Sequence, residues 1–274
     1  MDLHRKAVGD IEVTALYDGF INMPPTWIQD MPGEEFERRL GLTPGQQGRI
    51  TVNSFLLKLG DAYAMVDAGS GPTMGPNLGL QPDSLRAAGV QPEEIRAVFL
   101  THFHPDHSNG LIDAAGTPIY PNAEIYAHER EEAFWLNDLP AGVPDMATRV
   151  AGNIRNSAKA YADRLHWVRE GEVTSGVAAV PLPGHTPGHT GWLVRSRGEG
   201  LIVWGDLIHV CAIQVETPEA VMTFDIDQES ARMSRRRGLD MVATDRLAVA
   251  GAHLDFPGFG TIERKGTGYR YVPG

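Results

Sequence analysis

Short apolar runs, separated by glycine, proline and charged residues, recur along this chain and predict a series of short strands. Residues 52–59 and 63–66 flank Gly60-Asp61, which predicts a β-hairpin. Residues 11–16 alternate apolar and polar side chains, as a half-exposed strand does. Further apolar runs predict strands at 97–100, 123–127, 177–180, 191–195, 201–204 and 247–250.

Helical patterns lie between these strands without alternating with them strictly. They predict helices at 34–40, 128–137, 144–164 and 228–241, and short helical pieces within 83–96. This order predicts an α/β (α+β) fold with mixed sheets and outer helices. No linker interrupts the pattern, so we expect one domain over residues 1–274. Residues 21–47 predict a lid or dimer-contact segment, with an ordinary surface loop as the alternative.

Side chains that can bind metal follow the ends of several predicted strands. They are Asp67, the group from His102 to His107, His185, Asp206 and His253. Side chains from five strand ends can meet only if those ends share one edge of a layered sheet structure. The sequence therefore predicts a site at such an edge.

The most informative stretch is Thr101-His102-Phe103-His104-Pro105-Asp106-His107. It follows a predicted strand, and strand side chains alternate between faces, so His102 and His104 are expected to point the same way. Three imidazoles and one carboxylate supply the nitrogen and oxygen ligands that zinc and similar divalent metals take. Their directions suit two adjacent ions better than one. Structural histidines around a turn are the alternative.

Composition narrows the chemistry and the partners. Cys211 is the only cysteine in 274 residues, so no intrachain disulfide can form and metal ligands must be histidine or carboxylate. A net charge of -11 argues against a nucleic-acid partner and against anionic membranes. No apolar window approaches the length of a transmembrane helix, and the first residues lack an apolar signal core. A cytoplasmic protein is therefore expected.

Together these residues resemble the ligand set of the metallo-β-lactamase superfamily. The resemblance runs from Val66-Asp67-Ala68-Gly69 to the C-terminus and implies a four-layer αββα sandwich of two mixed sheets. It implies that one metal ion is held by His102, His104 and His185, the other by Asp106, His107 and His253, and that Asp206 bridges them.

This assignment leaves room for a hydroxide that bridges the two ions. Two divalent ions lower the pKa of bound water; zinc is expected, with iron, manganese or cobalt as alternatives. Pro-Gly-His-Thr occurs twice in tandem, and the family's ligand comes from the first copy, so His185 is chosen and His189 orients the loop. Asp67 is expected to accept a ring N–H from a metal-bound histidine, with a turn-forming role as the alternative.

Within the superfamily, the chain is most similar to the branch of methyl parathion hydrolase and the acyl-homoserine lactonases. Residues 134–136, 204–210, 252–260 and 266–273 carry this likeness. It implies hydrolysis of lactones of the acyl-homoserine type, with phosphotriester or aryl ester turnover as a side activity. The chain lacks the tyrosine that these lactonases place shortly after the bridging aspartate, and His209 stands nearby.

The expected mechanism uses the bridging hydroxide as nucleophile, with Asp106 passing a proton to the leaving alkoxide. The candidate pocket residues are Trp27, Phe134, Trp135, His209 and Phe256. Because most of them are aromatic, a small neutral substrate with an apolar arm is expected, although core packing is the alternative for each tryptophan. A homodimer is also expected.

Other functions stay open on the sequence alone. A thioesterase or a β-lactam hydrolase of the same fold would use the same metal ligands. Histidine and carboxylate do not determine the metal, so an iron-dependent redox enzyme is a further alternative. A non-catalytic module that holds metal or lactone is the last one.

Overall fold

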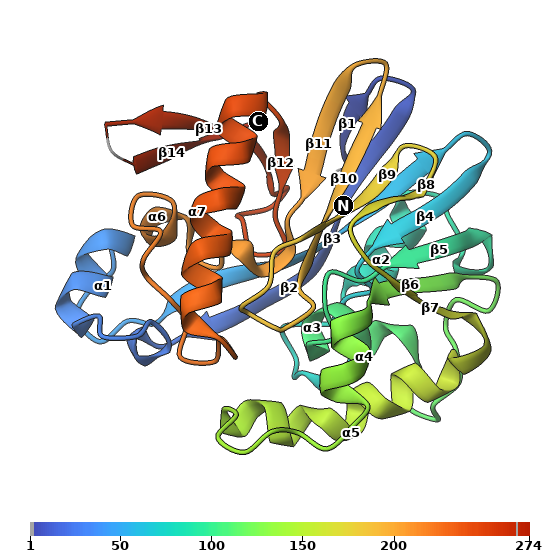
Figure 1. Cartoon of the computed structure of the whole chain (residues 1–274), viewed down its shortest axis with the longest axis horizontal. Helices are drawn as coiled ribbons and strands as arrows, with labels where there is room; N and C mark the ends of the chain where they lie inside the picture. Colours follow the sequence, from blue (N-terminus) through green and yellow to red (C-terminus); the bar gives the residue numbers. More distant parts are fainter. Residues whose placement is uncertain (1–2, 267) are drawn as a thin grey trace.

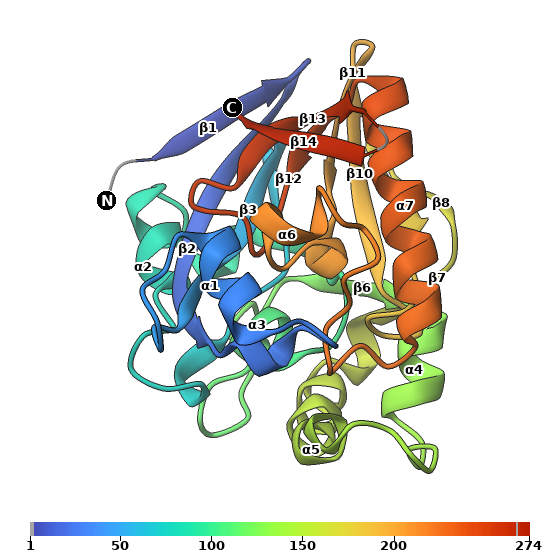
Figure 2. The same cartoon turned by 90° about the vertical axis from the view of Figure 1, so that its left-hand side faces the viewer.

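The computed structural model describes residues 3–266 and 268–274 of the chain. Thr267 belongs to the stretch 266–273 that resembles the lactonase branch, and it lies outside the described residues. Within the described residues, the strands form two sheets of seven (Figures 1 and 2).

Both sheets are mixed. The first sheet contains, in spatial order, β1 (His4–Val8), β2 (Ile11–Met23), β3 (Gly48–Leu59), β4 (Ala62–Val66), β5 (Ile95–Phe99), β6 (Glu124–His128) and β7 (Leu165–Val168). The second contains β14 (Gly268–Pro273), β13 (Phe259–Lys265), β12 (Ala248–Ala250), β11 (Glu199–Val203), β10 (Thr190–Ser196), β9 (Val177–Pro181) and β8 (Gly171–Thr174). The pairs β4–β5, β5–β6, β6–β7 and β11–β12 are parallel.

The two sheets pack face to face through the inward side chains of their strands. Leu57 of β3 and Phe99 of β5 belong to the same buried cluster as Leu201 and Val203 of β11. Strand side chains point alternately to the two faces, so the intervening residues point outward and need a second covering layer.

Helices supply that outer layer on both sides. On the first sheet, Val98 packs in one cluster with residues of α2 (Gln81–Ala87), α4 (Glu129–Trp135) and α5 (Asp145–Ala160). On the second sheet, Ile202 packs in another cluster with Leu239 of α7 (Gln228–Asp245). Figure 1 shows α7 along the second sheet and α4 and α5 beside the first. The predicted four-layer αββα sandwich is confirmed.

Short elements fill the connections. They are α1 (Gly33–Leu40), α3 (Pro105–Ser108) and α6 (Cys211–Gln214), with single 3-10 turns at Pro25–Trp27, Gly71–Thr73, Pro92–Glu94, Asn109–Leu111, Ala162–Arg164 and Gly205–Leu207. The turn Gly205–Leu207 contains Asp206, and α3 contains Asp106 and His107, so both carry predicted ligands.

Residues 21–47 are more regular than expected. Strand β2 continues to Met23, and α1 lies within the segment. Ile28 pairs with Met222 as an isolated bridge, and Thr223 N donates to the carbonyl oxygen of Trp27 at 2.8 Å. Phe36 is buried in the same cluster as Met222. The segment is therefore packed onto the loop between α6 and α7, and its function as a lid or dimer contact stays a prediction.

The predicted strands and helices correspond to observed ones with shifted ends, but five strands had no counterpart in the sequence prediction. They are β1, β7, β8, β13 and β14. These strands lie at or near the sheet edges and carry many exposed polar side chains, as in the sequence FGTIERK of β13. The hydrophobic alternation on which the predictions relied is weak there.

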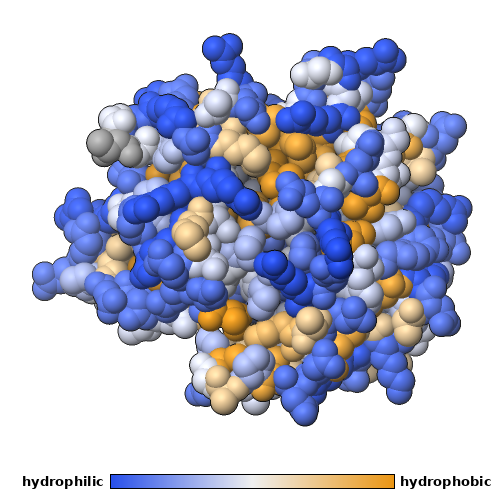
Figure 3. Space-filling view, viewed as in Figure 1, coloured by the Kyte–Doolittle hydropathy of each residue, from blue (hydrophilic) through white to orange (hydrophobic). Residues whose placement is uncertain are grey.

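The outer surface is mainly hydrophilic. Among the described residues, the large hydrophobic side chains that are exposed are those of Leu80 and Met233. Figure 3 shows apolar residues in smaller patches between charged ones on one face. No helix within the described residues combines the length and apolar character needed to cross a lipid bilayer.

Candidate metal centre

The predicted ligands reach the same point from the ends of strands in both sheets. His102 and His104 follow β5, and Asp106 and His107 lie in α3, where Pro105 begins the helix. The other three follow β9, β11 and β12 and are His185, Asp206 and His253. Strand β5 ends at Phe99, so the two histidines of the His-x-His pair lie in a loop. Their common direction therefore does not come from the alternation of side chains along a strand.

Three histidines form a first group around one oxygen of Asp206. Nδ1 of His104 lies 2.7 Å from Nε2 of His185. Asp206 Oδ2 lies 3.1 Å from that Nε2 and 3.7 Å from Nε2 of His102. One ligand atom from each of these four residues lies within 4.8 Å of the others, a spacing that a single ion could occupy.

A second group forms around the other oxygen of Asp206. Nε2 of His107 and Nε2 of His253 each lie 3.4 Å from Oδ2 of Asp106. Asp206 Oδ1 lies 3.0 Å from Nε2 of His107 and 3.3 Å from Nε2 of His253. Nε2 of His253 lies equally close, at 3.3 Å, to Oδ2 of Asp206. The carboxylate of Asp206 therefore lies between the two groups and is within reach of both.

The outer ring nitrogens of three of these histidines are held by protein acceptors. Nδ1 of His107 is 2.8 Å from Oδ2 of Asp67, and Nδ1 of His253 is 2.8 Å from the carbonyl oxygen of Thr51. Nδ1 of His185 is 2.8 Å from Oδ1 of Asp225. An acceptor at Nδ1 holds the proton there and directs the lone pair of Nε2 into the cluster.

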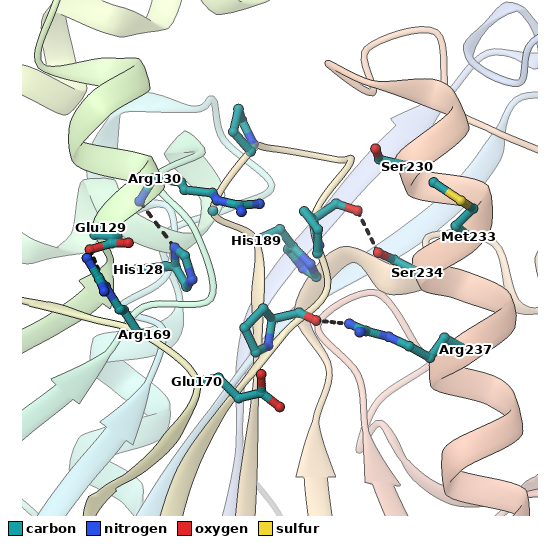
Figure 4. A pocket seen from close by; sticks show the side chains of 14 residues that line it. His128, Glu129, Arg130, Arg169, Glu170, His189, Ser230, Met233, Ser234 and Arg237 are labelled. Carbon is teal, nitrogen blue, oxygen red and sulfur yellow. Dashed lines mark hydrogen bonds and ion pairs between the residues drawn. The ribbon is translucent and has the colours of Figure 1, made fainter.

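His189 lies beside the cluster but does not join either group. Its Nδ1 donates to the carbonyl oxygen of Leu182 at 2.9 Å, and its Nε2 accepts from the backbone N–H of Asp206 at 2.9 Å. Both nitrogens are thus used, and the ring supports the turn that carries Asp206. His189 also lines an outer groove of about 580 Å³ between α4 and α7. Figure 4 shows the side chains that line this groove.

Several inward atoms of the cluster are buried without a hydrogen bond. Among the described residues, these include Nε2 of His102, Nε2 of His107 and Oδ1 of Asp206. His107 and Asp206 lie close, but their approach does not have the geometry of a hydrogen bond. Each unsatisfied buried polar atom costs about 1–3 kcal/mol, which a coordinated cation would remove. The His/Asp cluster is therefore suited to metal binding.

Electrostatics keep two imidazoles of the cluster neutral and Asp206 ionised, as metal ligands need, but favour the protonated form of the other histidines. Burial lowers the pKa of His102 and of His104 well below the usual value. Burial opposes ionisation of Asp206, but the neighbouring imidazoles, His107 foremost, hold the pKa of that carboxyl well below its usual range. Burial also acts to lower the pKa of His185, yet hydrogen bonds to Asp206 and Asp225 raise it to about 9. Burial likewise acts to lower the pKa of His107 and of His253, but Asp206 and Asp106 raise both. A bound cation would displace these protons.

A cavity of about 380 Å³ opens beside the cluster. From the cluster it is lined by His104, Asp106, Asp206 and His253. Apolar lining comes chiefly from Ile21, Trp27, Ile50, Met74 and Phe224, and the charged lining residues outside the cluster are Asp145 and Arg149. One charge of each sign leaves the wall with no net charge there.

The structure places two of the predicted pocket residues at this cavity. They are Trp27 and His209. The ring of Trp27 meets that of Phe224 edge-on, with centroids 5.5 Å apart. Nε2 of His209 lies 3.0 Å from Oδ2 of Asp206, but neither of its ring nitrogens makes a hydrogen bond.

The other three predicted pocket residues do not line the cavity. Trp135 is fully buried, and its indole N–H donates to Glu131. Phe134 packs in the core between α4 and the first sheet. Phe256 packs edge-on against His4 and Tyr17. For Trp135, core packing is the alternative that the sequence left open; Phe134 is also buried in the core, whereas Phe256 is only partly buried.

The sequence prediction missed two carboxylates close to the cluster. Asp225 holds His185, and it stands in the apolar stretch Val221-Met222-Thr223-Phe224-Asp225-Ile226, where an isolated acid is a signal. Glu131 is fully buried on α4, four residues before the buried Trp135. Residues at this spacing lie on the same face of a helix, so the apolar Trp135 could have indicated that Glu131 faces the core.

A family model described as the metallo-beta-lactamase superfamily matches residues 48–253, which include every residue of the cluster. The chain belongs to the metallo-beta-lactamase superfamily. Among solved structures, a hydrolase of that superfamily called AbOPH superposes with a TM-score of 0.92 at 29% sequence identity, covering 99% of this chain and 97% of the other. A dizinc quorum-quenching lactonase called AidC superposes with a TM-score of 0.93 at 26% identity, over the same shares.

Curated relatives of this superfamily member include lactonases. An N-acyl homoserine lactonase of Bacillus sp is 24% identical over 59% of this chain and 65% of its own length. Another, from Bacillus cereus, is 22% identical over 77% of this chain and 84% of its own. An uncharacterized Bacillus subtilis protein, YobT, is 26% identical over 57% of this chain. The match covers less than two thirds of the first two relatives, 61% of YobT and 65% of the Bacillus sp enzyme.

Proposed function

We propose that this chain is a dinuclear metal-dependent lactonase that opens neutral lactones with an apolar arm, acyl-homoserine lactones foremost. One observation carries the proposal: the carboxylate of Asp206 lies between two groups of histidines, within reach of both, beside an apolar-walled cavity. The lactonase names of two curated relatives and one neighbouring structure support the choice of substrate.

In this proposal the cluster holds two ions. One ion would be held by His102, His104 and His185, the other by Asp106, His107 and His253, and Asp206 would contribute its carboxylate to both. Bound divalent ions, zinc in the first instance, lower the pKa of water and polarise a carbonyl oxygen.

The protein's own residues orient the substrate and move the proton. Asp106 lines the cavity and is 9% exposed, so its carboxylate can take the proton of the attacking oxygen and pass it to the departing alkoxide. His209 also lines the cavity, and its unused ring nitrogen can make a hydrogen bond to a polar group of the substrate. Trp27 and Phe224 give the acyl arm an apolar wall that excludes water.

An activity screen with metal analysis tests the proposal. Zinc-loaded protein should hold two ions per chain and open a medium-chain acyl-homoserine lactone, measured as proton release. Turnover of a neutral phosphotriester such as methyl paraoxon should be weaker. Chelator-treated protein is the matched control.

Three results would contradict the proposal in different ways. Efficient cleavage of a thioester or a β-lactam with no lactone opening would reject the substrate. At most one tightly bound ion would reject the dinuclear site. Iron as the dominant metal after purification without added metal would favour redox chemistry.

The assembly and location remain separate predictions. We propose a homodimer of single-domain chains of residues 1–274, with residues 21–47 at the contact or over the cavity, and a cytoplasmic location. Light scattering on the purified full chain tests the dimer, and cell fractionation tests the location. Neither result bears on the metal site.

A further inference from the structure

A buried carboxylate outside the cluster joins two of the loops that carry histidines. Glu131 on α4 is fully buried. Its Oε2 accepts from the backbone N–H of Phe103 at 3.0 Å and from the indole N–H of Trp135 at 2.9 Å. Its Oε1 accepts from the backbone N–H of Gly188 at 2.8 Å. These three donors are all uncharged, so the carboxylate has hydrogen bonds but no cation partner among them.

The two backbone donors occupy informative positions. Phe103 stands between His102 and His104, and Gly188 stands in the loop between His185 and His189. One side chain therefore bonds both loops that supply the three histidines of the first group. The hydrogen bonds found for Glu131 within the described residues do not reach α3 or the loop after β12, which supply the second group.

Close packing at Gly188 strengthens this link. A Cβ atom at residue 188 would lie 2.7 Å from Cγ of Glu131 and 2.7 Å from its backbone nitrogen. Contacts under about 3 Å force atoms to move, so any larger residue would push the loop away from α4. The glycine of the second Pro-Gly-His-Thr copy is therefore required by its contact with Glu131.

We propose that Glu131 is a positioning residue for the first metal ion, held by His102, His104 and His185. By bonding Phe103 and Gly188, Glu131 sets the distance between the His102–His104 loop and the His185 loop. Its loss weakens the first ion and leaves the second in place. This inference rests on the proposed two-ion site, but it does not depend on the lactone substrate.

The test compares Glu131→Gln with Glu132→Gln. The first replaces one acceptor oxygen by an NH2 group, which cannot accept from Gly188 while the other oxygen serves Phe103 and Trp135. The second makes the same chemical change one residue along α4, at an exposed side chain. Affinity for each ion is measured by chelator competition, and cobalt-substituted protein gives the absorption spectrum of each site.

We expect Glu131→Gln to lower the affinity for one ion by about 10- to 100-fold and to leave the affinity for the other ion unchanged. The weakened ion should be the one that His185→Ala also loses, and its cobalt spectrum should change. Glu132→Gln should match the parent protein. Trp135→Phe removes the indole donor and part of a buried ring but keeps both backbone hydrogen bonds of Glu131, so it should lower stability while retaining both affinities.

Gly188→Ala provides an independent version of the test if Glu131→Gln does not fold. It keeps the carboxylate but displaces the loop, so the same ion should be weakened. Equal weakening of both ions, or lower thermal stability with both affinities intact, would overturn the inference. A parent protein with a single ion would reject the dinuclear proposal instead, and Glu131→Gln must then still weaken that ion. If the parent protein opened no lactone, the proposed substrate would be rejected, but the two metal affinities would still test the inference about Glu131.

Discussion

Oδ2 of Asp67 lies 2.8 Å from Nδ1 of His107, although the two residues are 40 positions apart. The other oxygen of Asp67 accepts from the backbone N–H of Thr101 at 2.8 Å. Asp67 itself has a φ of 61°, in the left-handed region that aspartate and asparagine tolerate better than most residues. The turn after β4 thus positions both the His-x-His loop and a histidine of the second group.

Asp67→Asn should lower the affinity for the second ion by about 10- to 100-fold and leave the affinity for the first ion unchanged. Asparagine keeps the left-handed turn, but its NH2 group would face Nδ1 of His107 while the amide oxygen serves Thr101. The ring proton would then move to Nε2, the atom that faces the cluster. Chelator competition on zinc-loaded protein measures the change, and the affinity of the first ion serves as the internal control. Unchanged affinity for both ions would leave Asp67 with a turn-forming role only.

His185→Ala and His189→Ala should behave differently. His185→Ala should lose metal and activity together. His189→Ala removes the acceptor for Asp206 N–H and the donor to Leu182, at roughly 1–3 kcal/mol for each group left unsatisfied, so it should mainly lower stability. Metal analysis and thermal unfolding of both variants separate the two roles. The opposite pattern would mean that the second Pro-Gly-His copy supplies the ligand.

Trp27→Ala should impair long acyl chains more than short ones. Trp27 and Phe224 form part of the apolar wall of the cavity, so removing the indole deprives a long chain of its contact. We expect kcat/KM for a decanoyl lactone to fall by roughly 10- to 100-fold, corresponding to about 1–3 kcal/mol of lost apolar contact. The butanoyl lactone is the control and should change little. An equal loss for both chain lengths would place Trp27 away from the acyl arm.

Cys211 should be chemically inert and separate from the metal site. Burial raises the pKa of its thiol from 9.0 to about 12, so the reactive thiolate is scarce at neutral pH. Labelling by a disulfide reagent at neutral pH should therefore be slow in the native protein and fast after unfolding. Cys211→Ser should leave the metal content unchanged. A lower metal content would indicate that the thiolate of Cys211 is a metal ligand.

The same shift of the Cys211 thiol gives a pH dependence with a definite sign. Between pH 9.0 and about 12 the unfolded thiol is ionised while the folded one keeps its proton. Its contribution to the free energy of unfolding is thus fully present below pH 9.0 and is lost as the pH rises toward about 12. Urea unfolding across this range should show a smaller loss for Cys211→Ser than for the parent protein. Equal losses would mean that the thiol ionises normally in the folded state.

Features that depend on neighbouring residues were predictable from the sequence. The hairpin around Gly60-Asp61 is present between β3 and β4, because a glycine with positive φ suits the turn and the flanking runs are apolar. The strand ends before Asp67, His102, His185, Asp206 and His253 also lie where the apolar runs stop. Side-chain type and spacing along the chain were sufficient to find the candidate ligands.

The sequence pattern by itself therefore determined mixed sheets with outer helices and the residues that could meet at a sheet edge, while the family resemblance implied the αββα sandwich. Tertiary structure alone decided that Phe134 and Trp135 belong to the core while Phe224 lines the cavity. It also decided that Asp225 pairs with His185 and that Glu131 joins Phe103 to Gly188. The physical reason is distance along the chain: hydrophobic alternation and turn chemistry act over a few residues, whereas these partners are 28 to 57 positions apart and meet only when the helices pack onto the two sheets.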